Sequence, residues 1–597
     1  MTHLKSTSLI ILLFVAFIML SYACNRAGNV EVTEKELTEH VKYLSSDELS
    51  GRLSGTEGDS LAALYIRNKF KLAGLIPMTK DGFQRFRVTS KAEPGDSNYL
   101  MIEDKEYSQD TDFKAMGFSE NQSLEAEVVF AGYGFSINND SVRRDDYSSE
   151  DVEGKWVMIL RGDPEPEKSD SYFIPFSKDR DKAMVAKDKG AGGVLLVSGP
   201  SFDPSDNFES LSPNDNNVGI PVIRIKQEIA DRILEKSDKD IAAIEKELIS
   251  TGNLLCFSTG TTVKASAEIL KKDAATRNIV MLLPGEDENL RNEYLIIGAH
   301  YDHLGTGGPG SSSRAVDTTG IHYGADDNAS GVSLMIELAE KFAGTKGSHK
   351  RSILFIAFSA EEMGLLGSKY FSENPLVDLS KVNAMINLDM VGRLNDDNSL
   401  QIGGVGTAEG FRDFVLKNTD TTGIKVTFTE EGYGPSDHSS FYGKNIPVLF
   451  YTTGAHLDYH TPSDTYDKLD YKGIVSISDR IYKLASALAN LDEILRFRES
   501  GPPQGTGRTI RMRGVTLGIM PDFAGNVKNG LRADLVTPGK PAALGGMKKG
   551  DIITSINGMS VNNIQDYMFR MSQLKHGQTI SVEVLRDNKK VILLIQL

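Results

Sequence analysis

The feature that most limits what this chain can form is a series of apolar runs, each followed by side chains able to bind a metal ion. The four runs span residues 294–299, 352–359, 384–388 and 447–451, and they lead to His300, to Glu361 and Glu362, to Asp389, and to His460. Ligand sites of open α/β sheets lie beyond the carboxyl ends of the strands. The runs therefore predict strands of one sheet whose carboxyl ends bring imidazoles and carboxylates together.

Helical patterns alternate with these runs, for example over residues 331–342 and 474–491. This alternation predicts an α/β domain with a mixed, mostly parallel central sheet flanked by helices. The segment 324–331, Gly-Ala-Asp-Asp-Asn-Ala-Ser-Gly, lies at a helix start, where the helix dipole favours carboxylates. A single Asp in such a place is usually a turn or cap residue, whereas adjacent acids such as Glu361 and Glu362 suit metal chemistry, one binding the ion and the other moving protons.

Taken together, these motifs resemble metallopeptidase family 28, the di-zinc aminopeptidases related to bacterial leucine aminopeptidases, glutamate carboxypeptidase and glutaminyl cyclase. The resemblance implies the zinc-peptidase fold and two zinc ions. It assigns metal-ligand roles to His300, Asp326, Glu362, Asp389 and His460, with Asp326 as the bridging carboxylate. It also makes Glu361 the general base, while Asp302 orients His300.

Some polar residues keep open interpretations. His438 is either a capped helix start or a substrate-binding residue, and Asp464 is a candidate for orienting His460. His303 and His456 are interpreted as ordinary loop histidines.

Two further stretches resemble accessory modules. Residues 129–135 and 151–155 are similar to the β-rich protease-associated (PA) domain. Residues 514–519 and 550–558 are similar to a small α+β PDZ domain, which binds an extended peptide or C-terminal carboxylate. Either module could instead be a spacer or docking scaffold. The expected organisation is a signal peptide at 1–24, peptidase segments at 25–124 and 263–497, a PA insert at 125–262, a linker at 498–508 and a PDZ domain at 509–597.

The N-terminus has the layout of a secretion signal. Lys5 precedes the apolar run 9–20, which is short for a membrane span, and Cys24 follows small residues as in a bacterial lipoprotein processing site. Ser21 stands where such sites usually have an apolar residue. We expect export across the inner membrane of a bacterium and a lipid anchor on Cys24 that holds the protein in the cell envelope; simple cleavage, which would release a secreted protein, and an uncleaved anchor are the alternatives.

Charge and cysteine content exclude other classes. The formal net charge is −16, while residues 505–597 carry 13 Lys and Arg against 6 Asp and Glu. An acidic chain is not expected to bind nucleic acid, which requires a net basic footprint. Because the only cysteines are Cys24 and Cys256, no disulfide framework is expected.

The favoured function is an exported aminopeptidase that removes N-terminal residues from peptides with a free N-terminus. Three alternatives stay open: a glutaminyl cyclase-like aminoacyl transferase, a dipeptide carboxypeptidase on the same fold, and a non-catalytic peptide-binding receptor.

Overall fold

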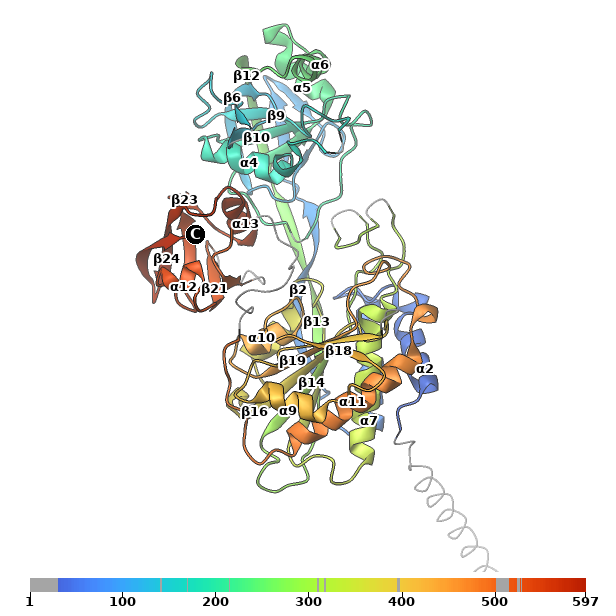
Figure 1. The fold of residues 1–597 in the computed structure, drawn as a ribbon. Coiled ribbons are helices and arrows are strands. Elements are labelled where there is room, and N and C mark those ends of the chain that lie inside the picture. The colour runs from blue at the N-terminus through green and yellow to red at the C-terminus, as the bar shows by residue number, and fades with distance from the viewer. Residues whose placement is uncertain are drawn as a thin grey trace, which may run out of the picture. The chain divides into compact units, whose positions relative to one another are not determined.

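The computed structural model describes residues 31–139, 142–168, 170–213, 215–308, 311–315, 318–394, 398–500, 515–522, 527 and 529–597. The predicted signal peptide, Cys24 and residues 501–508 of the predicted linker lie outside the described residues. The chain divides into two compact units, one formed by Met1–Val88 with Ala274–Arg508 and the other by Thr89–Asp273 with Thr509–Leu597 (Figure 1).

The first unit is built on a nine-stranded sheet with the strand order β1-β13-β15-β14-β16-β19-β17-β18, in which β2 also pairs with β13. The strands are β1 (Ile76–Pro77), β2 (Phe83–Pro94), β13 (Ile269–Leu283), β14 (Tyr294–His300), β15 (Ser352–Phe358), β16 (Val382–Leu388), β17 (Ser399–Gly403), β18 (Lys425–Phe428) and β19 (Val448–Thr452). The four central strands β15, β14, β16 and β19 run parallel, whereas β13 and β17 are antiparallel to their neighbours β15 and β19. The predicted α/β class with a mixed, mostly parallel sheet is confirmed.

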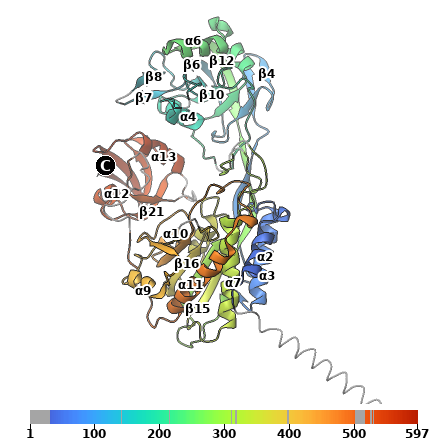
Figure 2. The same cartoon turned by 45° about the vertical axis from the view of Figure 1, so that its right-hand side comes forward.

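Helices cover both faces of this sheet (Figure 2). They are α2 (Glu34–Leu44), α3 (Glu57–Leu72), α7 (Gly331–Gly344), α8 (Leu366–Glu373), α9 (Phe411–Asn418), α10 (His438–Tyr442) and α11 (Tyr471–Ala489). Ile353, Phe355 and Ala357 of β15 belong to the core that also contains the buried faces of α2, α3, α7 and α11. Phe358 contacts Phe441 of α10 instead, with ring centroids 5.9 Å apart. Since side chains alternate along a strand, α10 lies on the opposite face from α7.

In the second unit, the residues before β13 form an eight-stranded sheet with the order β4-β3-β12-β6-β9-β10-β11-β5. Its strands are β3 (Tyr99–Ile102), β4 (Lys105–Tyr107), β5 (Phe113–Ala115), β6 (Gln122–Ala131), β9 (Trp156–Leu160), β10 (Gly193–Val197), β11 (Val222–Ile225) and β12 (Cys256–Ala267). The hairpin β7 (Ser136–Asn138) and β8 (Arg143–Asp145) and the helices α4 (Asp179–Asp188), α5 (Gln227–Leu234) and α6 (Ile241–Thr251) complete this part.

The C-terminal residues of the second unit form a separate small sheet with its own core. It contains β20 (Ile519–Pro521), β21 (Leu531–Val536), β22 (Ile552–Ile556), β23 (Met559–Ser560), β24 (Thr579–Arg586) and β25 (Lys589–Gln596), with the helices α12 (Pro541–Leu544) and α13 (Ile564–Ser572). This is the small α+β module that the sequence predicts.

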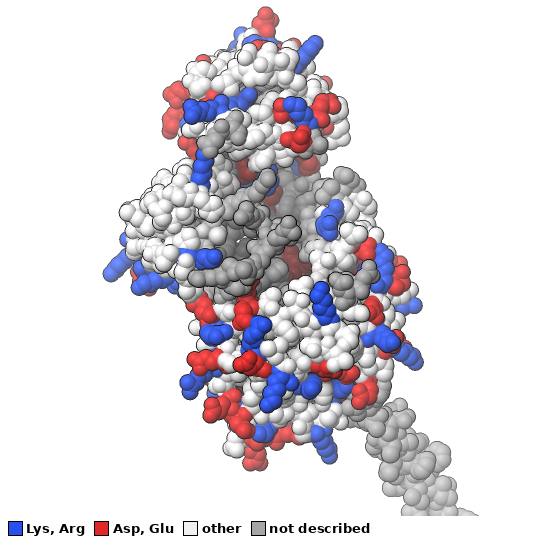
Figure 3. All heavy atoms as spheres, viewed as in Figure 1, with Lys and Arg blue, Asp and Glu red and all other residues white. Residues whose placement is uncertain are grey.

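On the face seen in Figure 3, acidic and basic side chains of the first unit are interspersed. Among the described residues, no helix combines the length and the apolar character needed to cross a membrane. Cys256 is a free thiol of intermediate exposure.

Candidate metal centre

The chemistry-bearing residues gather at the carboxyl ends of the central parallel strands. His300 is the last residue of β14, Asp389 directly follows β16, and Glu361 and Glu362 follow β15. Because β14 lies between β15 and β16, these three strand ends are neighbours. The loop after β19 adds His460, as the sequence predicts.

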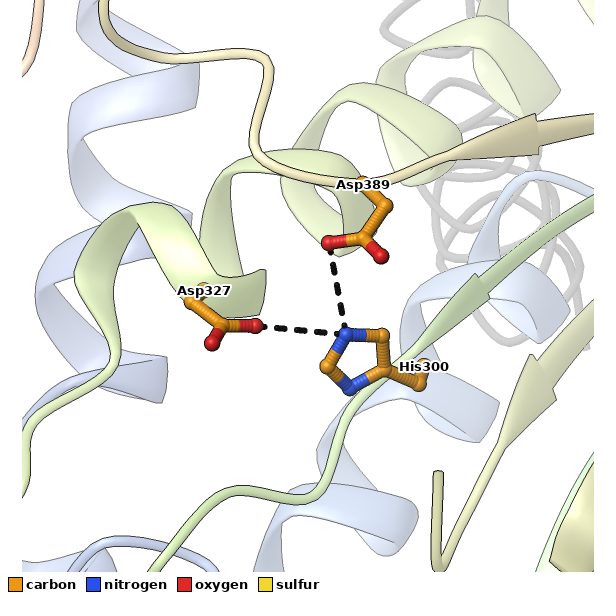
Figure 4. Close-up of side chains that lie close together, drawn as sticks. All are labelled: His300, Asp327 and Asp389. Carbon is orange, nitrogen blue, oxygen red and sulfur yellow. Dashed lines mark ion pairs between the residues drawn. The ribbon is translucent and has the colours of Figure 1, made fainter. Parts of the chain in front are cut away.

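A first potential ligand group contains His300, Asp327 and Asp389 (Figure 4). Nε2 of His300 lies 3.3 Å from Oδ1 of Asp327 and 3.4 Å from Oδ1 of Asp389. The candidate ligand atoms of the three residues all lie within 4.8 Å of one another, and the side chains of His300 and Asp327 are almost completely buried. One imidazole and two carboxylates therefore converge on one point.

A second potential ligand group shares Asp327. Nδ1 of His303 lies 2.8 Å from Oε1 of Glu362 and 3.7 Å from Oδ2 of Asp327. Nε2 of His460 lies 3.2 Å from both Oδ2 of Asp327 and Oε2 of Glu362. The two carboxylate oxygens of Asp327 thus face different groups, the arrangement needed to bridge two ions.

The predicted bridging residue, Asp326, lies outside both groups. Its Oδ1 accepts a hydrogen bond from the backbone N–H of Gly392 at 2.7 Å, and its Oδ2 lies 3.3 Å from Nε2 of His456. Both aspartates belong to the irregular turn η4 (Ala325–Ser330), in which Asp327 has the non-helical dihedral angles φ −106° and ψ 92°. This conformation directs the two neighbouring carboxylates to different partners, and the pattern of the sequence does not reveal which one faces the site.

His303 is the residue that the sequence interpretation missed. The sequence pattern predicts a loop histidine, yet His303 is fully buried and contacts Glu362. The available signal was its place three residues after His300, in the same loop.

Hydrogen bonds from outside the two groups orient several of their members. Ser436 Oγ donates to Oδ2 of Asp389 at 2.6 Å, and Nδ1 of His460 lies 2.9 Å from the backbone carbonyl of Ser312, which leaves Nε2 facing the carboxylates. Such partners fix the orientation of metal-binding imidazoles and carboxylates.

Asp302 and Asp464 both accept hydrogen bonds from backbone N–H groups of the candidate metal centre. Asp302 accepts from the N–H groups of Glu361 at 3.1 Å and Glu362 at 3.4 Å, while its Oδ1 stays 3.8 Å from Nδ1 of His300. Asp464, a candidate for orienting His460, accepts instead from the backbone N–H groups of Asp326 and Asp327 at 2.9 and 3.1 Å.

The titration behaviour reflects a crowded acidic site. Burial raises the pKa of Glu361 well above its usual range; His300 opposes this shift, and the carboxylates of Glu362 and Asp437 add to it. Burial also acts to raise the pKa of Asp327, but contacts with His300 and His460 hold it well below its usual range. A site in which carboxylates outnumber the cations that can neutralise them favours a bound cation.

His438 takes a different place. It begins α10, is 2% exposed and stacks on Phe450 with ring centroids 4.5 Å apart. Burial lowers the pKa of His438 to about 3, so the ring is neutral at physiological pH. The helix-start interpretation describes its position, and the substrate-binding role stays a prediction.

The donor set fits transition-metal ions. Nε2 of His460 is buried and makes no hydrogen bond with any other described atom, although it faces two carboxylates. Mixed imidazole and carboxylate ligands suit Zn²⁺ better than Ca²⁺ or Mg²⁺. The residues that converge here therefore fit zinc or another transition-metal ion.

Family models match three regions of the chain. Residues 278–485 match the model described as peptidase family M28, residues 124–233 match the PA domain, and residues 516–597 match the PDZ domain. The predicted class of enzyme, a metallopeptidase, is confirmed by the first match. The match to peptidase family M28 lies after the PA-domain match and before the PDZ-domain match, in the predicted order.

Individual relatives agree with this assignment. Aminopeptidase YwaD of Bacillus subtilis (strain 168) is 25% identical over 477 residues, which cover 76% of this chain and 86% of that protein. A probable leucine aminopeptidase of Arthroderma benhamiae is 30% identical over 217 residues, 34% of this chain and 56% of the relative, so the match spans little more than half the length of the fungal protein.

Among solved structures, BSAP, a zinc aminopeptidase from Bacillus subtilis, is 22% identical with a TM-score of 0.47, covering 78% of this chain and 99% of that chain. The aminopeptidase from Aneurinibacillus sp. strain AM-1 is also 22% identical, with a TM-score of 0.46 and coverage of 79% and 97%.

Proposed function

We propose that this protein is an exported zinc aminopeptidase that removes N-terminal residues from peptides at a carboxylate-bridged di-zinc centre. The observation that carries the proposal is the position of Asp327, whose two carboxylate oxygens face two separate groups of imidazoles and carboxylates. The names of the relatives, several of which are aminopeptidases, support the substrate class.

The residues that would hold the ions are His300 and Asp389 on one side, Glu362 and His460 on the other, and Asp327 between them. This set differs from the one predicted from the sequence at the bridging position, where Asp327 replaces Asp326. When bound, two zinc ions supply Lewis acidity toward a scissile carbonyl and an attacking water.

Glu361 is the proposed general base. It lies three residues after the end of β15, and its backbone N–H donates a hydrogen bond to Asp302. Its carboxylate takes the proton of the attacking water and passes it to the leaving amine, so the same group acts first as base and then as acid. The raised pKa of its carboxyl group in the absence of cations suits a residue that must hold this proton between the two steps.

The proposal also assigns roles to the PA domain, the PDZ domain and the N-terminus. The PA domain takes up residues 125–262 and the PDZ domain residues 509–597; the PDZ domain binds an extended peptide or a C-terminal carboxylate. The signal peptide directs export from a bacterial cytoplasm, and Cys24 carries the lipid anchor that keeps the enzyme in the cell envelope.

Mass spectrometry of the products tests the reaction. Zinc-loaded protein from Asn25 onward is mixed with unblocked, N-acetylated and N-terminal-Gln peptides, and the matched Glu361→Gln variant is the control. Stepwise release of first residues, abolished by acetylation and by the substitution, is the expected result. Loss of ammonia from the Gln peptides alone would identify a cyclase, and unchanged peptides would contradict the proposal.

A further inference from the structure

The motif Gly51–Arg52–Leu53–Ser54–Gly55, together with Asp59 at the start of α3, supplies buried polar groups to the metal centre, although no proposed metal ligand or base comes from it. Ser54 is 1% exposed and Asp59 is fully buried. Burying polar groups is costly unless each makes hydrogen bonds, so their partners indicate what they do.

The backbone of this motif fits closely against the loop after His300. The N–H of Gly305 donates to the carbonyl of Gly51 at 2.9 Å, and the N–H of His303 donates to that of Arg52 at 3.3 Å. Gly51 has φ +73°, and a Cβ atom there would lie 2.3 Å from the carbonyl oxygen of Gly305, so only glycine fits.

The Arg52 side chain forms hydrogen bonds with the backbone of two segments that lead to the candidate ligands. Its guanidinium donates to the carbonyls of Tyr301 at 2.7 Å, Tyr323 at 2.8 Å and Gly324 at 2.9 Å. Tyr301 directly follows His300, and Tyr323 and Gly324 lie in the segment that leads to Asp327.

Ser54 contacts the turn that carries Glu361 from two directions. Its hydroxyl donates to Oδ2 of Asp302 at 3.0 Å and accepts from the backbone N–H of Ala360 at 3.0 Å. Asp302 in turn accepts from the N–H groups of Glu361 and Glu362. Ala360 has φ +59°, a left-handed conformation that is unfavourable for a residue with a Cβ atom, so the turn needs such external hydrogen bonds to persist.

Asp59 holds the start of the same turn. It accepts from Ser359 Oγ at 2.9 Å and from Thr276 Oγ1 at 2.9 Å, and Ser359 directly precedes Ala360. The hydroxyls of Ser359 and Ser54 lie 3.2 Å apart. A continuous chain of buried polar groups therefore runs from Asp59 through Ser359 and Ser54 to Asp302.

We propose that Ser54 and Asp59 are positioning residues, which act through Asp302 and Ser359 to fix the turn that carries Glu361 and Glu362. This inference rests on the proposed function. Apolar residues could fill the same volume without the desolvation cost of a buried carboxylate, whereas a satisfied polar network fixes one geometry.

The test compares Ser54→Ala and Asp59→Asn with the matched control Ser45→Ala. Ser45 also has a buried hydroxyl in the N-terminal segment, but among the described residues this hydroxyl bonds only to the carbonyl of Val41, at 2.7 Å, within α2 and its capping turn. Each protein is titrated with Co²⁺ in place of zinc, and the visible absorption spectrum, which depends on ligand geometry, is recorded beside kcat and KM.

We expect Ser54→Ala and Asp59→Asn to change the cobalt spectrum, to weaken cobalt affinity or lower kcat by roughly 10- to 100-fold, and to leave KM within about twofold. Ser45→Ala should match the wild type, and Ser54→Thr, which keeps a hydroxyl, should recover most of the wild-type spectrum. If Asp59→Asn does not fold, the comparison of Ser54→Ala with Ser54→Thr provides the test.

Wild-type spectra and kcat in both Ser54→Ala and Asp59→Asn would overturn the inference. If the wild type binds cobalt but cleaves no peptide while the variant spectra still differ, the proposed function fails and the positioning role stands. If the wild type binds no cobalt, both fail.

Discussion

Oδ1 of Asp327 lies 3.3 Å from Nε2 of His300, whereas the carboxylate of the adjacent Asp326 is held by a backbone N–H and by His456. Two neighbouring aspartates of one turn therefore have separate tasks. Asp327 belongs to both groups of the candidate metal centre, and Asp326 belongs to neither.

The adjacent pair gives a matched test of the bridging position. Asp327→Ala should abolish binding of both zinc ions, because both groups lose a ligand, whereas Asp326→Ala should keep bound zinc in a folded protein. Zinc content after gel filtration, measured by mass spectrometry of the metal, checks this. Retention of two zinc ions by Asp327→Ala would rule out the bridging role.

Glu361→Gln should keep both zinc ions and lower kcat by roughly 100- to 10,000-fold, since removing a general base typically has an effect of this size. The substitution preserves the size of the side chain and its backbone hydrogen bond to Asp302. Zinc content and steady-state kinetics on an unblocked peptide are measured together. Near-full activity would show that another group takes the proton.

Ser436→Ala should weaken zinc binding or activity by roughly 10- to 100-fold, because Asp389 loses the hydroxyl that orients its Oδ2 atom. Competition with a coloured chelator measures the affinity. Ser440→Ala, which removes a neighbouring hydroxyl bonded to Ser368, is the control and should leave the affinity unchanged.

Asp59→Asn should change how stability depends on pH. Burial raises the pKa of Asp59 to about 6 from 3.8, so between these values the unfolded state releases its proton first and wild-type stability falls as pH rises. Asparagine does not ionise, so the stability of the variant does not fall in this way as the pH rises. Relative to the wild type, it should gain about 2 kcal/mol in unfolding free energy between pH 4.5 and 7.5. Denaturant unfolding at the two pH values, monitored through hydrogen exchange of the amides in α3, measures the difference in unfolding free energy between variant and wild type. A difference that does not depend on pH would contradict the raised pKa of Asp59.

Removal of zinc should destabilise the unit that contains the metal centre and leave the other unit unchanged. A ligand present at 100 times its dissociation constant stabilises the state that binds it by about 2.7 kcal/mol. Calorimetry before and after treatment with a chelator should therefore show one transition that moves to lower temperature and returns when zinc is added back.

The sheet and most of the site were predictable because both follow from strand ends. The predicted strand run 352–359 corresponds to β15 (Ser352–Phe358), and the predicted helix 474–491 corresponds to α11 (Tyr471–Ala489), which starts three residues earlier because Asp470 accepts a hydrogen bond from the N–H of Gly473 at 2.9 Å. Apolar periodicity locates such elements, but a capping residue sets their ends.

Features that depend on local dihedral angles or on distant partners were not predictable. The orientation of Asp327 rather than Asp326 depends on the backbone angles of one turn, and no periodic pattern encodes these angles. The contact between His303 and Glu362 depends on how the loop after β14 folds. The pairing of β2 with β13 joins segments separated by more than 170 residues, and apolar patterns do not specify long-range partners of this kind.

The five proposed ligands lie between His300 and His460, on four strand ends and one helix start. No short fragment of the chain holds the set, so a partly synthesised or partly folded chain has no complete metal centre. Since ligand sets that folding assembles bind metal together with the folded state, we expect zinc to enter last. We therefore expect each copy of the chain to cleave no peptide, including the unfolded chains around it, until its catalytic unit has finished folding.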